Sequence, residues 1–409
     1  MSERSRFQTG GQAYLRQINL SAIMNYIREE PPISRSNLAE KTGLNKATVS
    51  SLVSELIDHK YVHEVGVASS GLGRPQVMLS INPAAGFIVG GEVGVDFILV
   101  IATDFEPRQI FRKYQKIETS EDADCILQKL IQQIKDAIDF CDEKGAGKFL
   151  GLAVGLPGLV EFAEGRLLCA PNLGWRDLPV KACLEKHFKG IPVFVDNEAN
   201  MALLGEYYFG AANKAEDVLY ISAGVGLGGS IMRSGHVFHG PVGIAGEFGH
   251  IVIDPNGELC ACGNRGCWET LASQKALYRF IKQAIESGAN SILEEFTKGD
   301  ASLLSVEMVV EAVKMNDKVA IDALANVAHY LGVGIASLID ILNPQLVLVG
   351  GSLSTAWEYM EAIIDSTLKE NVLLRNQQTT KVILAKHEMN ACVMGAIGTV
   401  FQAIFSEPQ

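Results

Sequence analysis

Residues 249–269 read GHIVIDPNGELCACGNRGCWE, and they are the most informative stretch of this 409-residue chain. They bring together one imidazole, from His250, and three thiols, from Cys260, Cys262 and Cys267. In a cytosolic protein, three cysteines this close together indicate a metal site before they indicate a disulfide. One nitrogen and three sulfur ligands complete the tetrahedron that Zn²⁺ prefers and leave no open position for a reacting water. We therefore predict a structural zinc ion here, with a loop of reduced cysteines as the alternative.

Glycine-punctuated β-type runs and helical stretches lie on both sides of this loop. The β-type runs span residues 87–104, 149–160, 192–197, 217–232 and 345–351, and helical stretches include 122–140 and 319–342. Strands that alternate with helices predict α/β layers. No stretch of the sequence comes close to the ~20 uninterrupted apolar residues that a membrane span needs, and the start of the chain lacks an apolar signal region. We therefore expect a cytoplasmic protein without a membrane segment.

The composition is that of a globular protein, and the length suggests two or three domains. The formal net charge of −12 argues against a protein that coats nucleic acid non-specifically, because most of its surface would repel phosphate. Residues 1–82 differ from the rest, with nine Lys and Arg against seven Asp and Glu. Only this segment is electrostatically suited to approach DNA.

The N-terminal segment has the pattern of a helix-turn-helix. Residues 15–30, about 34–40 and 45–60 are predicted helices, and Pro31-Pro32 ends the first of them. Serine and asparagine side chains stand where they can cap the second and third helices, and Gly43 permits the sharp turn between them. The alternative is a helical hairpin that binds a protein. The inward face of the third helix is expected to be Val49, Leu52, Val53 and Leu56.

The third helix begins with small, polar and basic residues, which favours DNA over a protein partner because this end points at base edges. Residues 61–82 follow as two expected strands joined by a glycine-rich loop, a wing that could lay Arg74 into a minor groove. A linker turn is the alternative for this loop. The predicted DNA-contacting residues are Arg35, Asn45, Lys46, Ala47, Thr48, Ser50, Ser51 and Arg74.

The metal loop also carries a family resemblance. It is similar to the ROK family (repressors, open reading frames and kinases), whose signature has Gly-His followed by Cys-x-Cys-Gly-x-x-Gly-Cys-x-Glu. With the helix-turn-helix and the Gly-Arg-Pro linker, the chain resembles the repressor branch, particularly its xylose-repressor-like members. The similarity covers nearly the whole chain, through LPG at 156–158, PNLGW at 171–175, DNEAN at 196–200, GEFGH at 246–250 and LVGG at 348–351.

The resemblance implies a fold and a division of the chain. The expected fold is a winged helix-turn-helix followed by an actin-like ATPase (ribonuclease H-like) domain with two α/β lobes and a sugar in the cleft between them. Residues 1–82 would form the DNA-binding domain with its linker. Residues 83–205, joined by a C-terminal helix at 391–405, would form the first lobe. Residues 206–390, with the zinc loop at 250–269, would form the second.

The sugar contacts of the family correspond here to a set of amides, carboxylates and one imidazole. Such groups suit vicinal hydroxyls, and a site built for hydroxyls rejects analogues that lack them. His250 could bind zinc through one ring nitrogen and the sugar through the other. For any one of these residues, the alternative is a loop hydrogen bond. The residues are Gly158, Asn172, Asn197, Glu198, Glu247, His250 and Glu269.

Three departures from the family's kinases predict that catalysis has been lost, so we assign no catalytic residue. The kinases carry Asp-x-Gly-Gly-Thr in the first phosphate loop, whereas residues 92–96 read Glu-Val-Gly-Val-Asp. The second phosphate loop, residues 223–228, begins with Ala223 where the kinases have Thr. The catalytic base of the kinases is an Asp, and this chain has Glu198, whose extra methylene displaces the carboxylate.

The sequence therefore predicts a sugar-responsive repressor that binds operator DNA as a homodimer or homotetramer. Xylose is the expected effector by branch resemblance, with glucose or another aldose close behind. Induction and co-repression are both open, because either follows from a sugar that binds one DNA-binding state more tightly. One alternative is an active ATP-dependent sugar kinase with a regulatory DNA-binding head. The other is a repressor controlled by protein docking, as in family members that answer to a membrane transporter subunit.

Overall fold

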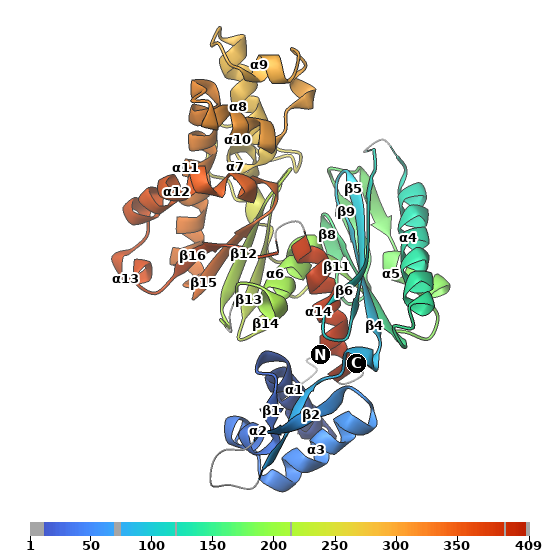
Figure 1. Cartoon of the computed structure of the whole chain (residues 1–409). Coiled ribbons are helices and arrows are strands. Elements are labelled where there is room, and N and C mark those ends of the chain that lie inside the picture. The colour runs from blue at the N-terminus through green and yellow to red at the C-terminus, as the bar shows by residue number, and fades with distance from the viewer. Residues whose placement is uncertain (1–11, 69–74, 119–120, 213–214, 388–389, 406–409) are drawn as a thin grey trace, which may run out of the picture.

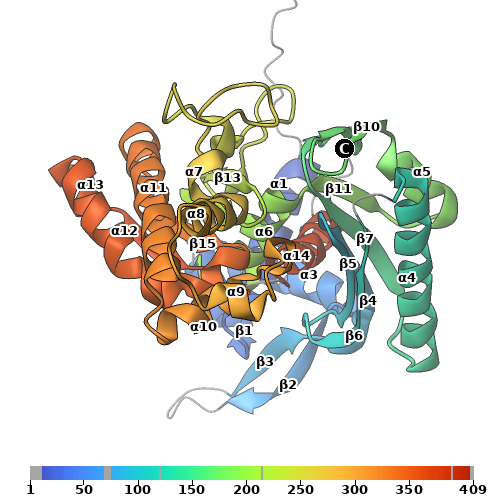
Figure 2. The same cartoon turned by 90° about the horizontal axis from the view of Figure 1, so that it is seen from above.

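A small N-terminal body and two larger lobes make up the chain (Figure 1). The computed structural model describes residues 12–68, 75–118, 121–212, 215–387 and 390–405. The two lobes stand side by side above the N-terminal body, and α14 (Ala391–Phe405) and α6 (Glu198–Phe209) lie between them (Figures 1 and 2). This arrangement confirms the predicted winged helix-turn-helix followed by a two-lobed α/β domain.

The N-terminal body is a winged helix-turn-helix. Ser34 caps α2 by accepting a hydrogen bond from the backbone N–H of Asn37, and Asn45 caps α3 by accepting one from Thr48. Gly43 has φ +69°, the left-handed conformation that the turn between the helices requires. The predicted inward face of α3 is buried. The elements are α1 (Gln12–Glu29), β1 (Ile33–Ser34), α2 (Arg35–Thr42), α3 (Lys46–Asp58), β2 (Val62–Ala68) and β3 (Gln76–Ile81), with strand order β1-β3-β2.

The first lobe is built on a five-stranded sheet with the order β11-β7-β4-β5-β6. Strands β4, β7 and β11 are parallel, whereas β5 and β6 are antiparallel to their neighbours. One face packs against α4 and the other against α14. The elements are η1 (Pro83–Ala85), β4 (Phe87–Val93), β5 (Phe97–Asp104), β6 (Gln109–Lys116), α4 (Ala123–Glu143), β7 (Phe149–Leu156), β8 (Leu159–Glu161), β9 (Arg166–Ala170), β10 (Trp175–Leu178), α5 (Val180–His187) and β11 (Val193–Asn197).

The second lobe has a sheet with the order β14-β13-β12-β15-β16, covered by helices. The strands are β12 (Val218–Ala223), β13 (Leu227–Arg233), β14 (His236–Val237), β15 (Leu346–Gly350) and β16 (Lys381–Leu384). The helices are η2 (Phe248–His250), α7 (Glu269–Ala272), α8 (Gln274–Glu286), α9 (Leu293–Phe296), η3 (Ala301–Leu303), α10 (Val306–Lys314), α11 (Lys318–Leu342), η4 (Ser352–Ala356), α12 (Trp357–Asn371) and α13 (Leu374–Gln377).

Helix α11 is the one helix of the described residues that is long and apolar enough to cross a membrane by length and composition. In the structure, 61% of its most apolar window is buried. Its buried side chains pack with those of α8 and α12 in the core of the second lobe.

Helices α6 and α14 pack unusually closely because glycines face each other at their contact. A Cβ at Gly395 would overlap the carbonyl oxygen of Met201, and one at Gly205 would overlap that of Ala391. Since neither glycine has room for a side chain, the two backbones touch over this length. The pair forms one unit that reaches from the space between the lobes to the winged helix (Figure 1).

An aromatic cluster joins the winged helix to the first lobe. The ring of Tyr61 lies 5.2 Å from that of Phe105 and 5.3 Å from that of Phe405, at the end of α14. Gln17 of α1 donates a hydrogen bond to the carbonyl oxygen of Phe405 at 2.8 Å. The winged helix is thereby fastened to the first lobe and to α14.

Candidate functional site

The four predicted metal ligands come together in the structure. The donor atoms of His250, Cys260, Cys262 and Cys267 all lie within 4.8 Å of one another. The Nδ1 atom of His250 is 3.5 Å from Sγ of Cys260, and the Sγ atoms of Cys262 and Cys267 are 3.6 Å apart. A tetrahedral zinc with Zn–S bonds of ≈ 2.3 Å places its sulfur ligands about 3.8 Å apart. The donor set therefore fits a four-coordinate metal ion.

The loop that carries these ligands depends on two local features. Gly266 has φ +64°, and a Cβ there would overlap the carbonyl oxygen of Asp254, so this position tolerates glycine alone. Trp268 is fully buried, and its indole N–H donates to the carbonyl oxygen of Tyr330 in α11 at 2.8 Å. The metal loop is thus anchored to the central helix of the second lobe.

His250 faces two ways. Its Nδ1 atom faces the thiols, and its Nε2 atom lies 3.9 Å from Oε2 of Glu247. The Cys260 thiol donates to Oε1 of Glu269 at 2.8 Å, and burial followed by this hydrogen bond raises the pKa of Cys260. A metal ion bound here must displace that proton. The loop therefore links the metal ligands directly to two carboxylates, those of Glu247 and Glu269.

All seven residues that the sequence predicts to contact a sugar line one cleft of about 670 Å³. From the first lobe, Gly158 follows β7, Asn197 ends β11 and Glu198 begins α6. From the second, Glu247 and His250 come from around η2, and Glu269 begins α7. Asn172 lies between β9 and β10. The carboxyl ends of parallel strands meet at one edge of a sheet, where α/β folds place their ligands.

Two of these residues shape the edge of the cleft. Gly158 has φ +94°, and a Cβ there would overlap the carbonyl oxygen of Cys169. The Asn197 side chain donates to the carbonyl oxygen of Gly158 at 2.7 Å and accepts from the backbone N–H of Ala199 at 2.8 Å. Asn197 therefore caps α6 and at the same time fixes the loop after β7.

Burial affects the pKa of two acidic residues of the cleft, Glu198 and Glu247. Burial, followed by the charge of Glu247, raises the pKa of Glu198 to about 7. Burial also raises the pKa of Glu247. The charge of His250 acts against this rise, and the charge of Glu269 adds to it. A carboxyl that holds a proton donates as well as accepts, which suits hydroxyl ligands.

The structure adds one contact across the cleft mouth that the sequence did not reveal. The Nζ atom of Lys275 in α8 donates to Oδ1 of Asn172 at 2.7 Å, which joins the second lobe to the first. Both residues are polar and exposed, and they lie 103 positions apart in the sequence. Local spacing gives no signal for such a pair.

An acidic and aromatic row in the first lobe was not among the predicted site residues. Glu92, Phe97 and Tyr114 line the same cleft as the seven predicted residues. The alternation of side chains along β4, β5 and β6 places all three on one face of the first-lobe sheet. This alternation indicates a ligand site only once the order of the strands is known.

A side chain packs against the loop after β4, the stretch that resembles the first phosphate loop of the family's kinases. The ring of Phe97 lies against Gly94, so close that a Cβ on Gly94 would overlap it. The described residues that line the cleft include five carboxylates, from Glu92, Asp96, Glu198, Glu247 and Glu269, and one guanidinium, from Arg176.

The predicted DNA-contacting residues of α3 lie on an exposed surface. Lys46, Ala47 and Ser51 are exposed on α3, together with Ser50 and the cap residue Asn45. Thr48 is half-buried and donates its backbone N–H to Asn45. Arg35, at the start of α2, is half-buried and pairs with Glu64 at 3.1 Å. Arg74 lies outside the described residues.

Comparison with known proteins gives this geometry a context. The ROK family matches residues 88–403, and the winged helix-turn-helix DNA-binding family matches residues 17–62. A xylose repressor of Caldicellulosiruptor bescii is 34% identical over 98% of this chain and 99% of its own length.

Two solved structures are similar to this one. A ROK family transcriptional regulator that is a homologue of the E. coli MLC protein aligns with TM-score 0.82 and 29% identity, over 96% of this chain and 97% of its own. A ROK family glucokinase from Streptomyces griseus, in complex with glucose and AMPPNP, aligns with TM-score 0.67 and 30% identity, over 76% of this chain and 98% of its own. The chain belongs to the ROK family.

Proposed function

We propose that this ROK protein is a sugar-responsive transcription repressor of carbohydrate-metabolism genes. The winged helix binds operator DNA, and an aldose in the interlobe cleft changes that binding. Xylose is the first candidate, because relatives that match nearly the whole chain are named xylose repressors. We divide the chain as the sequence suggests, into residues 1–82, 83–205 with 391–405, and 206–390. Operator binding would place the protein in the cytoplasm.

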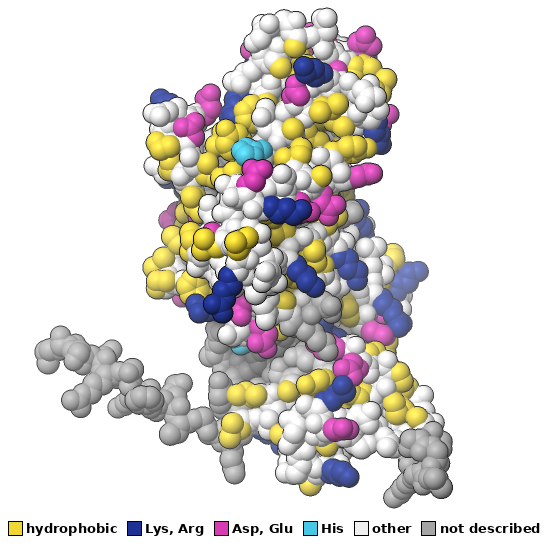
Figure 3. All heavy atoms as spheres, turned by 90° about the vertical axis from the view of Figure 1, so that its left-hand side faces the viewer, with side chains coloured by type: hydrophobic (Ala, Val, Ile, Leu, Met, Phe, Trp, Pro, Cys, Tyr) yellow, Lys and Arg dark blue, Asp and Glu magenta, His cyan; other side chains and the backbone are white. Residues whose placement is uncertain are grey.

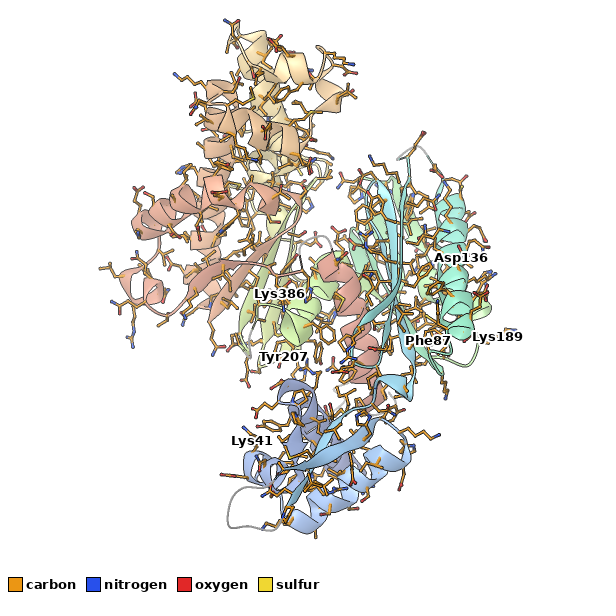
Figure 4. All side chains as sticks on the ribbon, in the orientation of Figure 1. Lys41, Phe87, Asp136, Lys189, Tyr207 and Lys386 are labelled. Atoms are coloured by element: carbon orange, nitrogen blue, oxygen red, sulfur yellow. The ribbon has the colours of Figure 1, made fainter. Side chains whose placement is uncertain are left out.

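One observation carries this proposal: α6 connects the cleft to the DNA-binding domain. Its first residue, Glu198, lines the cleft, and its last turn contacts α1 of the winged helix. Figure 4 labels Tyr207 in this last turn, at the side that faces the winged helix. If a ligand in the cleft shifts the first turn of α6, the last turn and its contact with the winged helix move with it.

The contact between α6 and the winged helix is made by Arg28. Its guanidinium lies 5.0 Å from the centroid of the Tyr208 ring and 5.8 Å from that of Phe209. Its Nη1 atom donates to the carbonyl oxygen of Tyr208. Glu206, in the same last turn, is fully buried and accepts backbone hydrogen bonds from Ala211, Lys386 and His387. These contacts fix the last turn of α6 both to the winged helix and to the segment that precedes α14.

The residues that would hold zinc are His250, Cys260, Cys262 and Cys267. Four protein ligands leave zinc a structural role, that of fixing the loop. The chain's own contribution is to turn Nε2 of His250 and the carboxylate of Glu269 toward the cleft. The proposed sugar contacts are these two residues with Gly158, Asn172, Asn197, Glu198 and Glu247.

We also propose that the cleft no longer transfers phosphate. The Phe97 ring covers Gly94, and the carboxylates of the cleft outnumber its one guanidinium among the described residues. With ATP, Mg²⁺ and a panel of hexoses and pentoses, a coupled assay is expected to show no sugar-dependent ADP release. Turnover within the ordinary enzyme range of 1–10³ s⁻¹ would instead support the kinase alternative.

The function is tested by fluorescence anisotropy of labelled DNA from the gene's own upstream region, with and without a panel of aldoses. One sugar is expected to change the DNA affinity tenfold or more, which corresponds to a coupling free energy of about 1.4 kcal/mol. No DNA binding would contradict the proposal. DNA binding that no sugar affects would point to control by a docked protein, for which a pull-down without sugar is the direct assay.

The exposed start of α3 gives a prediction for the DNA interface. Lys46→Ala is expected to weaken binding to all DNA sequences by a similar factor and to reduce the slope of log affinity against log salt concentration by about 1. The reason is that one fewer phosphate is neutralised. Salt titrations of anisotropy measure this slope. Lys60→Ala is the matched control, because Lys60 is exposed beyond the end of α3. Equal slopes for Lys46→Ala and the unmodified protein would remove Lys46 from the interface.

We propose a homodimer or homotetramer, because two winged helices suit two operator half-sites. Apolar side chains gather in several groups on the face of the second lobe that Figure 3 shows. Among the exposed residues of that lobe, Ile341 is 72% and Leu374 79% exposed. Light scattering in solution is expected to give the mass of two or four chains, and a monomer mass would contradict this.

A further inference from the structure

A row of side chains extends the cleft beyond the residues that the proposed sugar contacts occupy. In the first-lobe sheet, Glu92 of β4 pairs with Leu99 of β5, and Leu99 pairs with Tyr114 of β6. Directly paired residues point to the same face, so Glu92 and Tyr114 share a face two strands apart, about 10 Å. Phe97 lies two residues before Leu99 and points the same way. Since all three line the cleft, this is the face that the ligand meets.

Phe97 and Tyr114 form a flat aromatic platform. Their ring centroids are 5.5 Å apart and their planes are inclined by 18°. Phe97 rests on Gly94, whereas the side of Tyr114 remains open, with the residue 42% exposed. A large aromatic surface left open inside a polar cleft is a place for an apolar ligand face.

Glu92 stands between this platform and the proposed sugar contacts. It is only 8% exposed, and its Oε2 atom has no hydrogen-bond partner among the described residues. Burial, followed by the charge of Glu198, raises the pKa of Glu92 well above its usual range, and the neighbouring Cys392 opposes this rise. A buried polar atom without a partner is costly unless a ligand supplies one.

The cleft is larger than a single sugar requires. Its volume of about 670 Å³ falls in the range of pockets that enclose drug-sized ligands, whereas a pentose has ten non-hydrogen atoms. A pyranose has an apolar face of C–H groups, which suits an aromatic ring, and an edge of hydroxyls, which suits an unpaired carboxyl oxygen. The exposed carboxylate of Asp96 beside the platform favours a neutral ligand over a phosphorylated one.

We propose that Glu92, Phe97 and Tyr114 form a second subsite, which binds a second sugar ring linked to the one held by the proposed sugar contacts. This inference rests on the proposed function and deepens it: the effector class becomes a short oligosaccharide or a glycoside. The second ring stacks on Tyr114, and one of its hydroxyls, or the linkage region, pairs with Oε2 of Glu92.

Calorimetry on the full-length protein tests this with two pairs of probes, xylose with β-1,4-xylobiose and glucose with cellobiose. In one pair, the disaccharide is expected to bind at least tenfold more tightly than its monosaccharide. Tyr114→Ala is expected to remove this advantage and to change monosaccharide affinity less than twofold. Tyr114→Phe, which keeps the ring, is the matched control and is expected to retain the advantage. Circular dichroism verifies that each variant is folded.

The outcomes separate the subsite from the function beneath it. If a monosaccharide binds and its disaccharide binds no more tightly, the second subsite is wrong, but the proposed sugar response stands. Equal losses of both ligands in Tyr114→Ala also overturn it, because they assign Tyr114 to the first sugar. A non-hydrolysable ATP analogue could compete with the disaccharide in the unmodified protein and not in Tyr114→Ala. This result would assign the platform to a nucleotide. If no probe binds, the proposed sugar response fails as well.

Discussion

Cys267→Ser is expected to reduce bound metal from about one ion per chain to nearly none and to weaken sugar binding about 100-fold or more. Cys267 is completely buried, and its backbone forms a β-bridge with Val252. The next two residues are Trp268, which anchors the loop, and Glu269, which lines the cleft. Without the metal, His250 and Glu269 lose their fixed positions, and two lost hydrogen bonds to the sugar at about 1.4 kcal/mol each amount to about 100-fold. Metal analysis and calorimetry with the effector sugar measure the two effects.

Cys125→Ser is the matched control, because Cys125 is an exposed free thiol in α4, far along the chain from the loop. It should keep both the metal and the sugar affinity. If Cys267→Ser loses the metal but binds sugar normally, the metal loop does not position the sugar contacts. If it keeps the metal, the assignment of Cys267 as a ligand is wrong.

Arg28→Ala is expected to leave sugar binding to the free protein within twofold of normal but to abolish the effect of sugar on DNA affinity. The guanidinium of Arg28 stacks on the aromatic end of α6 and donates a hydrogen bond to its backbone, which ties α1 to α6. Removing it leaves the cleft intact, since Arg28 is not among the residues that line it. The tenfold or larger sugar effect on operator affinity should fall below about twofold, which means a coupling close to zero.

Two further variants make this result interpretable. Arg28→Lys keeps the charge but not the planar group that stacks on Tyr208, and it should retain only part of the coupling. Arg16→Ala removes an exposed arginine of the same helix, which pairs with Glu55 of α3 instead of α6. It should keep the full sugar response. A normal sugar response in a folded Arg28→Ala protein would show that the signal takes another route, such as the aromatic cluster around Phe405.

The parts of the site that the sequence predicted well are those defined by local spacing. The metal ligands lie within 18 residues of one another, and their chemistry is visible without knowledge of the fold. The caps of the helix-turn-helix are equally local, since Ser34 and Asn45 act on backbone groups three residues ahead. The outline of the cleft came instead from family resemblance, because its residues are dispersed from Gly158 to Glu269.

The parts that the sequence did not predict depend on register and on packing between distant segments. Glu92 and Tyr114 face the same cleft only because β4, β5 and β6 pair in one particular register. The bond from Lys275 to Asn172 and the stacking of Arg28 on Tyr208 join segments more than 100 residues apart. In the sequence, Glu92 stands out only as a departure from the kinase pattern, whereas its unpaired Oε2 atom depends on the neighbours that the fold places around it.

The central claim is that the cleft and the winged helix are thermodynamically coupled, and reciprocity tests it most directly. The measurement is the dissociation constant of the effector sugar by calorimetry, for the free protein and for the protein saturated with operator DNA. Because coupling between two binding sites is reciprocal, operator must change sugar affinity by the same factor, tenfold or more, by which sugar changes operator affinity. Identical sugar dissociation constants with and without bound operator would contradict the account.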